Sequence, residues 1–240
     1  SFTDRNHITH HGDVNYAQAE DIEKADIVLL CVKSFQISSA IKKTSAQLNK
    51  NASIILANNG MGTLTELPIN IVENRNIYTL LTTHGCLRSA PLTITHTGIG
   101  STDIGLISGN TNIEKQKSLT QLLNAALPNV TYHKKIQQKQ WLKLAINCVI
   151  NPITAVNNID NGQVNDDAYL QITIALLREV ISVACVEGVK LNLGELKQTI
   201  EQVALATALN SSSMRCDVLA NRRSEIDNIN GYIHRLGIEH

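Results

Sequence analysis

The stretch between residues 25 and 57 constrains the fold most, because two short apolar runs in it flank one amphipathic segment. Residues 25–32 and 53–57 are continuous apolar runs of strand length, a pattern typical of strands covered on both faces of a parallel sheet. Residues 35–48, between them, carry apolar side chains at helical spacing. The order strand, helix, strand predicts an open α/β sheet, whose ligands bind beyond the carboxyl ends of the strands.

Three more segments have strand character, at residues 77–83, 92–97 and 102–107. The last two flank Gly98-Ile-Gly100, and glycines between two such runs indicate a β-hairpin. We therefore expect residues 92–97 and 102–107 to pair with each other.

The character of the sequence changes near residue 133. From there on, apolar side chains recur at helical spacing in four segments, residues 137–150, 166–187, 193–209 and 226–236. We predict an α/β domain of the nucleotide-binding type over residues 1–133 and an all-α domain over residues 134–240, with the active cleft between them. Because the last residues still have a helical pattern, we expect the carboxyl-terminal end of the second domain to be truncated.

Charge and cysteine usage exclude several classes of function. The 240 residues carry 21 basic and 21 acidic side chains, so no global field attracts nucleic acid or an anionic membrane. No uninterrupted apolar run approaches the ~18 residues that span a bilayer, and no secretory signal is visible. The five cysteines stand singly and the histidines lack metal-ligand spacing, so we expect reduced thiols, a cytoplasmic protein and no metal site.

The segment from Trp141 to Pro152 carries the clearest indication of chemistry. Within an otherwise apolar helical pattern, Lys143, Asn147 and Asn151 follow one another at four-residue spacing, which places them on one stripe of one face. An unpaired buried polar group costs about 1–3 kcal/mol, and a polar ligand could supply the missing partners. The alternatives are a surface lysine and an asparagine cap, because the residue before a proline is pushed out of the helical region and the helix is expected to end or kink there.

Two polar residues follow the predicted buried strands. Lys33 comes directly after residues 25–32, and Asn59 follows the next apolar run, within Asn58-Asn-Gly-Met-Gly62. A cofactor contact at the strand ends is one interpretation; a solvated lysine and an ordinary Asn-Gly turn are the others. The sequence lacks the G-x-G-x-x-G loop of a dinucleotide-binding fold, so in such a fold the first βα unit would precede Ser1.

Two polar segments near the carboxyl end have ordinary structural interpretations. The triplet Ser211-Ser-Ser213 is typical of a loop. Ser224 with Asp227 three residues later resembles a helix N-cap. This pair predicts a helix that begins near Glu225, where an acidic side chain also suits the helix dipole.

Five blocks of the sequence occur in a characteristic order. They are Cys31-Val-Lys-Ser-Phe-Gln36; Asn59-Gly-Met-Gly62; Trp141-x-Lys-Leu-x-x-Asn-x-x-Ile-Asn-Pro-Ile-Thr-Ala155; Ser212-Ser-Met214 with Asp217; and Glu225-Ile-Asp-x-Ile-Asn-Gly231. In this combination the chain resembles the ketopantoate reductase (2-dehydropantoate 2-reductase) family over nearly its whole length. The family's amino-terminal Gly-rich unit and its last helical stretch have no counterpart in this sequence.

The resemblance implies a fold and an activity. It implies a Rossmann-type α/β domain over residues 1–133 that binds NADP and lacks its first βα unit, followed by an all-α substrate and catalytic domain over residues 134–240. It also implies the reduction of 2-dehydropantoate (ketopantoate) by NADPH to (R)-pantoate, on the route to pantothenate and coenzyme A. The expected partner is then a small-molecule substrate, with no nucleic acid or membrane, and both a monomer and a homodimer stay open.

The resemblance further implies roles for single residues. Lys143 matches the general acid, and Glu225 matches an acidic residue that meets the cofactor and the lysine. The substrate contacts implied are Lys143, Asn147, Asn151, Asn161, Ser213 and, more weakly, Asn210; the cofactor contacts implied are Lys33, Asn59, Glu225 and Cys86. At Cys86 the thiol departs from the small residue usual in the family.

Elementary chemistry supports the role of Lys143. Reduction of a keto group builds negative charge on its oxygen, which a nearby ammonium can both stabilise and protonate. Desolvation should lower the pKa of this lysine, and a carboxylate close by should oppose that shift. Two other functions stay open: a related dehydrogenase for another 2-keto acid, and a non-catalytic cofactor-binding or interaction protein.

Overall fold

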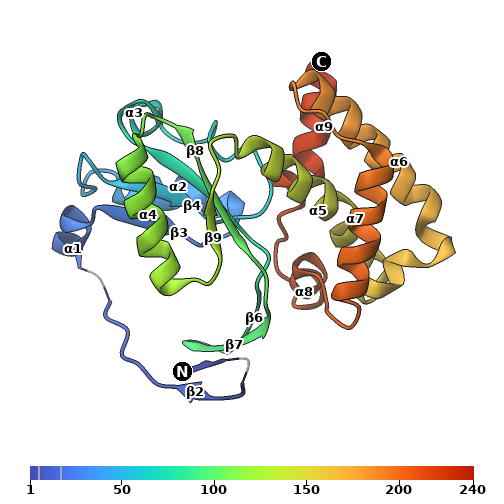
Figure 1. Cartoon of the computed structure of the whole chain (residues 1–240), viewed down its shortest axis with the longest axis horizontal. Coiled ribbons are helices and arrows are strands. Elements are labelled where there is room, and N and C mark those ends of the chain that lie inside the picture. Colours follow the sequence, from blue (N-terminus) through green and yellow to red (C-terminus); the bar gives the residue numbers. More distant parts are fainter. Residues whose placement is uncertain (5, 17) are drawn as a thin grey trace. The chain divides into compact units, whose positions relative to one another are not determined.

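The computed structural model describes residues 1–4, 6–16 and 18–240, which form two compact units (Figure 1). The sheet unit comprises Ser1–Val32, Ser38–Asn58 and Leu67–Ile136. The helical unit comprises Gln137–His240 together with two short segments from the amino-terminal half, Lys33–Ile37 and Asn59–Glu66. We expected every residue up to 133 to belong to the α/β domain, but these two short segments group with the helices.

A five-stranded sheet in the order β3-β4-β5-β8-β9 forms the centre of the sheet unit. Its strands are β3 (Ile27–Leu30), β4 (Ser53–Leu56), β5 (Ile77–Thr82), β8 (Thr102–Ser108) and β9 (Val130–Tyr132). The first three run parallel, β8 runs antiparallel to β5, and β9 runs parallel to β8. The strand–helix–strand order predicted for residues 25–57 is confirmed, with α2 (Ser34–Thr44) between β3 and β4.

One apolar cluster of this unit lies between the sheet and α4 (Ile113–Ala126). Ile55 of β4 is fully buried and belongs to one apolar cluster with Leu119 and Leu123 of α4. Neither α4 nor β9 is among the elements that we predict from the sequence. Two short helices, α1 (Ala19–Lys24) and α3 (Ile69–Asn74), lie in the connections between strands (Figure 1).

A second sheet of four strands contradicts the predicted hairpin. Its order is β2-β1-β7-β6, with β1 (Phe2–Thr3), β2 (Thr9–His10), β6 (Gly85–Ala90) and β7 (Thr93–Gly98). The hairpin between residues 92–97 and 102–107 is wrong, because β7 pairs with β6 whereas β8 pairs with β5. A Cβ atom at Gly100 would lie 2.4 Å from the backbone carbon of Thr83, so this glycine allows two chain segments to approach closely where the chain passes between the sheets.

The strand β3 was predicted to be buried on both faces, and the structure shows that it is not. It is the first strand in the sheet order, and within the ranges that the structure covers it pairs only with β4. Leu29 is 46% exposed as a result. An apolar run shows that a strand can be covered, but burial depends on which elements lie beside it.

The helical unit packs around an apolar cluster that includes the fully buried Trp141. Its helices are α5 (Gln137–Asn157), α6 (Asp167–Val186), α7 (Leu193–Ala206), α8 (Ser213–Leu219) and α9 (Asn230–Glu239), with short 3-10 turns at Asn161–Asn165 and Ile226–Asn228. The helices predicted at residues 137–150, 166–187 and 193–209 are confirmed as α5, α6 and α7. The element order of both units agrees with the predicted fold class, an α/β domain followed by helices.

One helix, α6, is long and apolar enough to cross a bilayer by length and composition, with a mean hydropathy of 1.6. Its residues Leu177, Val180 and Val183 are buried in the apolar cluster of the helical unit. This packing accounts for the apolar side of α6, since a helix that faces a core carries such a stripe.

The helix α5 continues through Pro152 to Asn157, so the helix end that the proline predicts does not occur. A proline has no N–H and leaves the carbonyl four residues earlier, here that of Cys148, without its helical donor. Asn230 Nδ2 donates a hydrogen bond to Cys148 O at 2.9 Å. A side chain from α9 therefore replaces the donor that the proline removes.

The helix predicted to begin near Glu225 begins later. Glu225 precedes the 3-10 turn Ile226–Asn228, and α9 starts at Asn230. The backbone at Ile229 has φ −104° and ψ −93°, which is not helical and separates the turn from the helix. The N-cap-like pattern at Ser224 therefore marks the short turn and not the helix.

Candidate active site

The polar stripe predicted from the sequence lies on α5. Lys143, Asn147 and Asn151 stand at successive turns of this helix, on one face. Cys148, beside them, is 1% exposed, and Asn151 is 6% exposed. The stripe therefore borders the apolar core, where the low dielectric strengthens a hydrogen bond to any bound partner.

The surroundings of Lys143 shift its protonation. Burial lowers the pKa of this amine from 10.5 to about 8, and the carboxylate of Glu225 acts in the opposite direction. Both effects have the direction expected from the sequence. At neutral pH the amine carries its proton, yet it releases the proton far more readily than an exposed lysine does.

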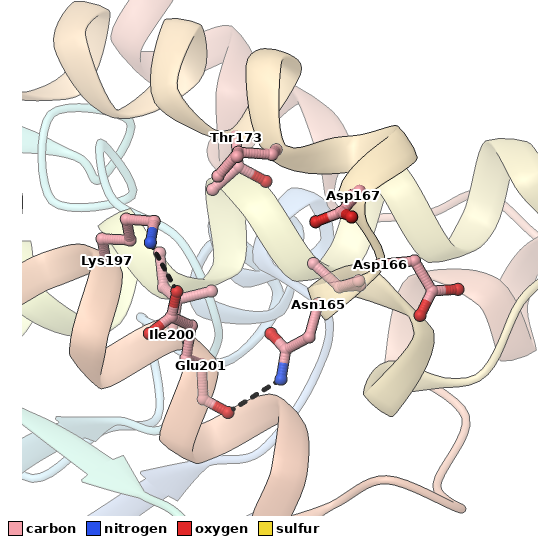
Figure 2. Close-up of a pocket in the computed structure, with 9 residues that line it drawn as sticks. Asn165, Asp166, Asp167, Thr173, Lys197, Ile200 and Glu201 are labelled. Atoms are coloured by element: carbon pink, nitrogen blue, oxygen red, sulfur yellow. Dashed lines mark hydrogen bonds and ion pairs between the residues drawn. The ribbon is translucent and has the colours of Figure 1, made fainter.

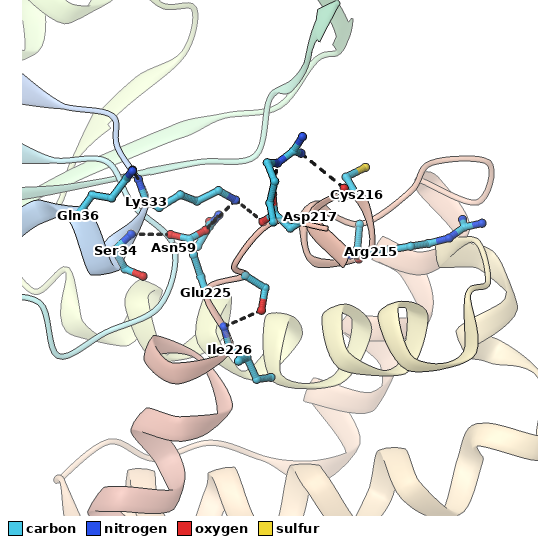
Figure 3. A network of polar contacts seen from close by, with 12 residues as sticks. Lys33, Ser34, Gln36, Asn59, Arg215, Cys216, Asp217, Glu225 and Ile226 are labelled. Atoms are coloured by element: carbon cyan, nitrogen blue, oxygen red, sulfur yellow. Dashed lines mark hydrogen bonds and ion pairs between the residues drawn. The ribbon is translucent and has the colours of Figure 1, made fainter. Parts of the chain in front are cut away.

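Glu225 brings together residues that lie far apart in the sequence (Figure 3). This glutamate is 5% exposed. Its Oε1 accepts a hydrogen bond from the backbone N–H of Ser34 at 3.0 Å, and its Oε2 accepts one from Asn59 Nδ2 at 3.2 Å. Lys33 Nζ lies 3.7 Å from the same Oε2. These partners offset the cost of burying a carboxylate, and they place Lys33, Asn59 and Glu225 in one polar group.

Lys33 has a closer carboxylate partner in Asp217, a residue for which the sequence predicts no role. Lys33 Nζ lies 2.5 Å from Asp217 Oδ2 (Figure 3). Arg222 Nε lies 3.3 Å from Asp217 Oδ1. The side chain of Asp217 is 4% exposed, whereas that of Lys33 is 33% exposed. The available signal was the position of Asp217 inside the block that begins at Ser212, because a buried aspartate needs charged or hydrogen-bonding partners.

The loop at Asn59 is shaped by glycine and by Asn228. Gly60 has φ +79°, and a Cβ atom there would lie 2.1 Å from Asn228 O. The backbone N–H of Met61 donates to that oxygen at 2.8 Å, and Asn228 Nδ2 donates to Met61 O at 3.3 Å. Asn59 and Gly60 thus form a turn, and this turn also places the side-chain amide of Asn59 against Glu225. The blocks that begin at Asn59 and Glu225 are therefore in contact.

The serine triplet caps α8. Ser212 Oγ accepts a hydrogen bond from Arg215 N at 3.1 Å, and it lies 2.7 Å from Thr154 Oγ1, within hydrogen-bond distance. Ser213, the predicted substrate contact, is the first residue of the helix and is exposed. Arg215 also pairs with Asp160, which ties α8 to the chain that follows α5.

The remaining predicted contacts have other surroundings. Asn161 Nδ2 donates to Thr207 Oγ1 at 3.0 Å, and the backbone N–H of Asn161 donates to Asn210 O at 3.0 Å. Asn161 Oδ1 is buried and has no hydrogen-bond partner in the described part of the chain, so it can accept a further bond. Cys86 lies on β6 of the sheet unit with an exposed thiol. The binding roles of Asn161, Asn210 and Cys86 stay predictions.

A separate pocket of about 120 Å³ opens among α6, α7 and the turn Asn161–Asn165 (Figure 2). Lys197 Nζ lies 2.7 Å from Glu201 Oε1 there, and Asn165 Nδ2 donates to Glu201 O at 3.1 Å. The residues that line this pocket include none of the predicted site residues. Across residues 1–4, 6–16 and 18–240, no group of three His, Cys, Asp or Glu side chains could hold a metal ion. The candidate active site is therefore the group around Lys143 and Glu225.

A mixed α/β sheet whose first three strands are parallel, followed by a helical unit with a partly buried lysine and amides, defines a class of protein, the two-unit dehydrogenases and reductases with a Rossmann-type fold. The family model described as "Ketopantoate reductase PanE/ApbA" matches residues 2–109, and the one described as "Ketopantoate reductase PanE/ApbA C terminal" matches residues 135–240. The chain belongs to the ketopantoate reductase PanE/ApbA family.

Individual relatives agree with this assignment. The chain is 35% identical over 216 residues to the 2-dehydropantoate 2-reductase of Vibrio cholerae serotype O1, covering 90% of this chain and 72% of that protein. The crystal structure of a PanE/ApbA family ketopantoate reductase from Ralstonia eutropha JMP134 is similar with a TM-score of 0.81 and 26% identity, over 92% of this chain and 72% of that one.

A solved structure with another activity shares the fold. The ternary structure of D-mandelate dehydrogenase with NADH and anilino(oxo)acetate is similar with a TM-score of 0.81 and 22% identity, over 92% of this chain and 72% of that one. The likeness at this identity concerns the fold alone.

Proposed function

We propose that this chain catalyses the reduction of 2-dehydropantoate to (R)-pantoate, with NADPH as the hydride donor, in the biosynthesis of pantothenate. The observation that carries the proposal is Lys143, an amine with a pKa of about 8 beside Glu225. Membership of the ketopantoate reductase family and the names of the relatives support the same reaction. The free cysteines suit our further proposal of a cytoplasmic location.

Lys143 is the proposed general acid. Reduction of the keto group moves an electron pair onto its oxygen, and the ammonium of Lys143 stabilises this charge and transfers its proton to the oxygen. The product is a hydroxyl group, and the neutral amine then regains a proton from solvent. Glu225 keeps the amine protonated at neutral pH, because its negative charge opposes the effect of burial on the pKa of Lys143.

The asparagines of α5 are the proposed substrate clamps. Asn147 and Asn151 continue the stripe from Lys143, so a substrate bound at the amine lies along the same helix face. Neutral amides donate hydrogen bonds to the substrate's carboxylate and hydroxyl groups without adding charge that would shift the pKa of the lysine. Asn161, Asn210 and Ser213 are proposed as further substrate contacts because of the family resemblance.

A nicotinamide cofactor is the proposed source of the hydride. The D-mandelate dehydrogenase with the same fold binds NADH, which supports a cofactor of this class, and the choice of NADPH rests on the family. Lys33 and Asn59 fit such a cofactor, since a partly exposed ammonium suits a phosphate and an amide suits a hydroxyl group. Glu225 and Cys86 are proposed as the remaining cofactor contacts.

The direct test follows NADPH absorbance when the purified complete gene product is mixed with ketopantoate, with NADH assayed in parallel. Lys143→Ala should lower kcat by about 10²- to 10⁴-fold, the usual contribution of a general acid. The matched control is Lys190→Ala, since Lys190 is an exposed lysine of the same unit. Lack of NADPH oxidation by the folded wild type would contradict the proposed function, and unchanged turnover of Lys143→Ala would contradict the assigned role.

A second candidate is a dehydrogenase for another 2-keto acid, which the fold shared with D-mandelate dehydrogenase favours. A panel of aliphatic and aromatic 2-keto acids separates the two. We expect the highest kcat/KM for ketopantoate, and a higher value for an aromatic 2-keto acid would favour the second candidate.

A further inference from the structure

Pro152 removes one backbone hydrogen bond of α5, and it does so in the part of the helix that carries the polar stripe. Proline has no N–H to donate to the carbonyl of Cys148. Cys148 directly follows Asn147 in the sequence. Pro152 itself directly follows Asn151. The unsupported turn is therefore the one that connects the two proposed substrate clamps.

Two side chains support this turn. Asn230 Nδ2 donates to Cys148 O at 2.9 Å, across 82 residues of sequence. On the other side of the proline, Thr154 Oγ1 donates to Ile150 O at 2.7 Å. Cys148 is 1% exposed, so water cannot easily take the place of Asn230 as a donor. The helix remains continuous because these side chains replace and supplement its own hydrogen bonds.

We propose that Asn230 is a positioning residue for the substrate site. By donating to Cys148 O it holds the turn that sets the spacing between Asn147 and Asn151, and so places both amides on one substrate. Asn230 acts through this carbonyl and does not touch the substrate. The inference rests on the proposed function, because it assigns substrate binding to the two amides.

The same geometry predicts which kinetic constant changes. Lys143 precedes the turn at Cys148 by more than one helical turn, and its pKa depends on burial and on Glu225. Loss of the Asn230 contact therefore displaces Asn151 relative to Asn147 while the protonation of Lys143 stays as it is. We expect KM for ketopantoate to rise by about tenfold in Asn230→Ala, with the pH at which the rate falls unchanged.

The experiment is a rescue with four proteins: wild type, Asn230→Ala, Pro152→Ala and the double variant. Alanine at residue 152 restores an N–H that donates to Cys148 O within the helix, so Asn230 is no longer needed. Pro152→Ala and the double variant should then both have the wild-type KM, whereas Asn230→Ala alone should have the raised value. Asn165→Ala is the matched control, since Asn165 also donates to a backbone carbonyl, that of Glu201, away from the stripe.

Each outcome decides the proposal. An unchanged KM in Asn230→Ala overturns it, and so does a tenfold difference in KM between the double variant and Pro152→Ala. If Asn230→Ala does not fold, folding of the double variant with the wild-type KM supports the same contact. Amide hydrogen exchange along α5 gives a readout without activity: exchange near Cys148 should be faster in Asn230→Ala and normal in the double variant. If the variants show this exchange pattern while the wild type does not reduce ketopantoate, the proposed function is refuted and the contact is established.

Discussion

Lys33 Nζ lies 2.5 Å from Asp217 Oδ2, although 184 residues separate the two in the sequence. Lys33 belongs to the short segment after β3 that groups with the helical unit, and Asp217 belongs to α8. The same ammonium lies 3.7 Å from Glu225 Oε2. One cation therefore interacts with two buried carboxylates, and one of them, Glu225, also opposes the lowering of the pKa of Lys143 by burial.

The Lys33–Asp217 pair should contribute measurably to stability. Lys33→Met leaves the buried carboxylate with Arg222 alone, and Asp217→Asn removes the charge that the lysine faces. In a double-mutant cycle measured by urea unfolding, we expect a coupling energy of about 1–2 kcal/mol. The exposed pair Lys197 and Glu201 is the control, with about 0.3–0.5 kcal/mol expected for such helix pairs. Additive effects at Lys33 and Asp217 would contradict this prediction.

Activity should depend on the protonation of Lys143. The general acid must carry its proton, so kcat/KM should fall as the pH rises above about 8. Glu225 raises the pKa of Lys143, and Glu225→Gln should therefore move this fall to lower pH. Rate profiles of the two proteins between neutral and alkaline pH test the prediction, and coinciding profiles would rule out the coupling.

The same pKa predicts how stability varies with pH. Below pH 8 Lys143 is protonated in both the folded and the unfolded state, and the folded state bears the full cost of burying the charge. Between pH 8 and 10.5 the unfolded chain binds more protons at this residue than the folded protein does, so the stability of the folded state rises with pH.

Lys143→Met removes this contribution. The free energy of unfolding of the wild type, relative to that of Lys143→Met, should increase through this window. Lys190→Met is the control for a general loss of positive charge. A constant difference between wild type and Lys143→Met would show that the amine is not desolvated.

Gly60 should tolerate no side chain. Gly60 and Gly188 both have positive φ, +79° and +75°, so alanine is strained at either position. A Cβ atom at Gly60 would also lie 2.1 Å from Asn228 O, whereas at Gly188 no atom lies within 4 Å. We expect Gly188→Ala to lose about 1 kcal/mol of stability and Gly60→Ala several times more, together with activity, because the loop carries Asn59. Equal losses in urea unfolding would contradict this account of the loop.

The predictions that succeeded from sequence rest on local periodicity. The βαβ order of residues 25–57 and the helices α5, α6 and α7 follow from continuous apolar runs of strand length and from apolar side chains three to four residues apart, both properties of neighbouring residues alone. The hairpin prediction failed because it concerned strand pairing. The glycines at residues 98–100 have the composition of a hairpin turn, yet the strands on either side join different sheets. Strand partners are chosen by the whole sheet, and no local pattern encodes that choice.

The candidate site shows the same difference between local sequence patterns and long-range contacts. The sequence by itself determined that Lys143, Asn147 and Asn151 share one face of a helix, since helical geometry follows from spacing. Only the tertiary structure decided that Glu225 accepts hydrogen bonds from the backbone of Ser34 and the amide of Asn59, and that Asp217 holds Lys33. Such charge and hydrogen-bond partners come from segments distant in the chain, and their effect depends on distance and burial, which exist only once the chain has folded.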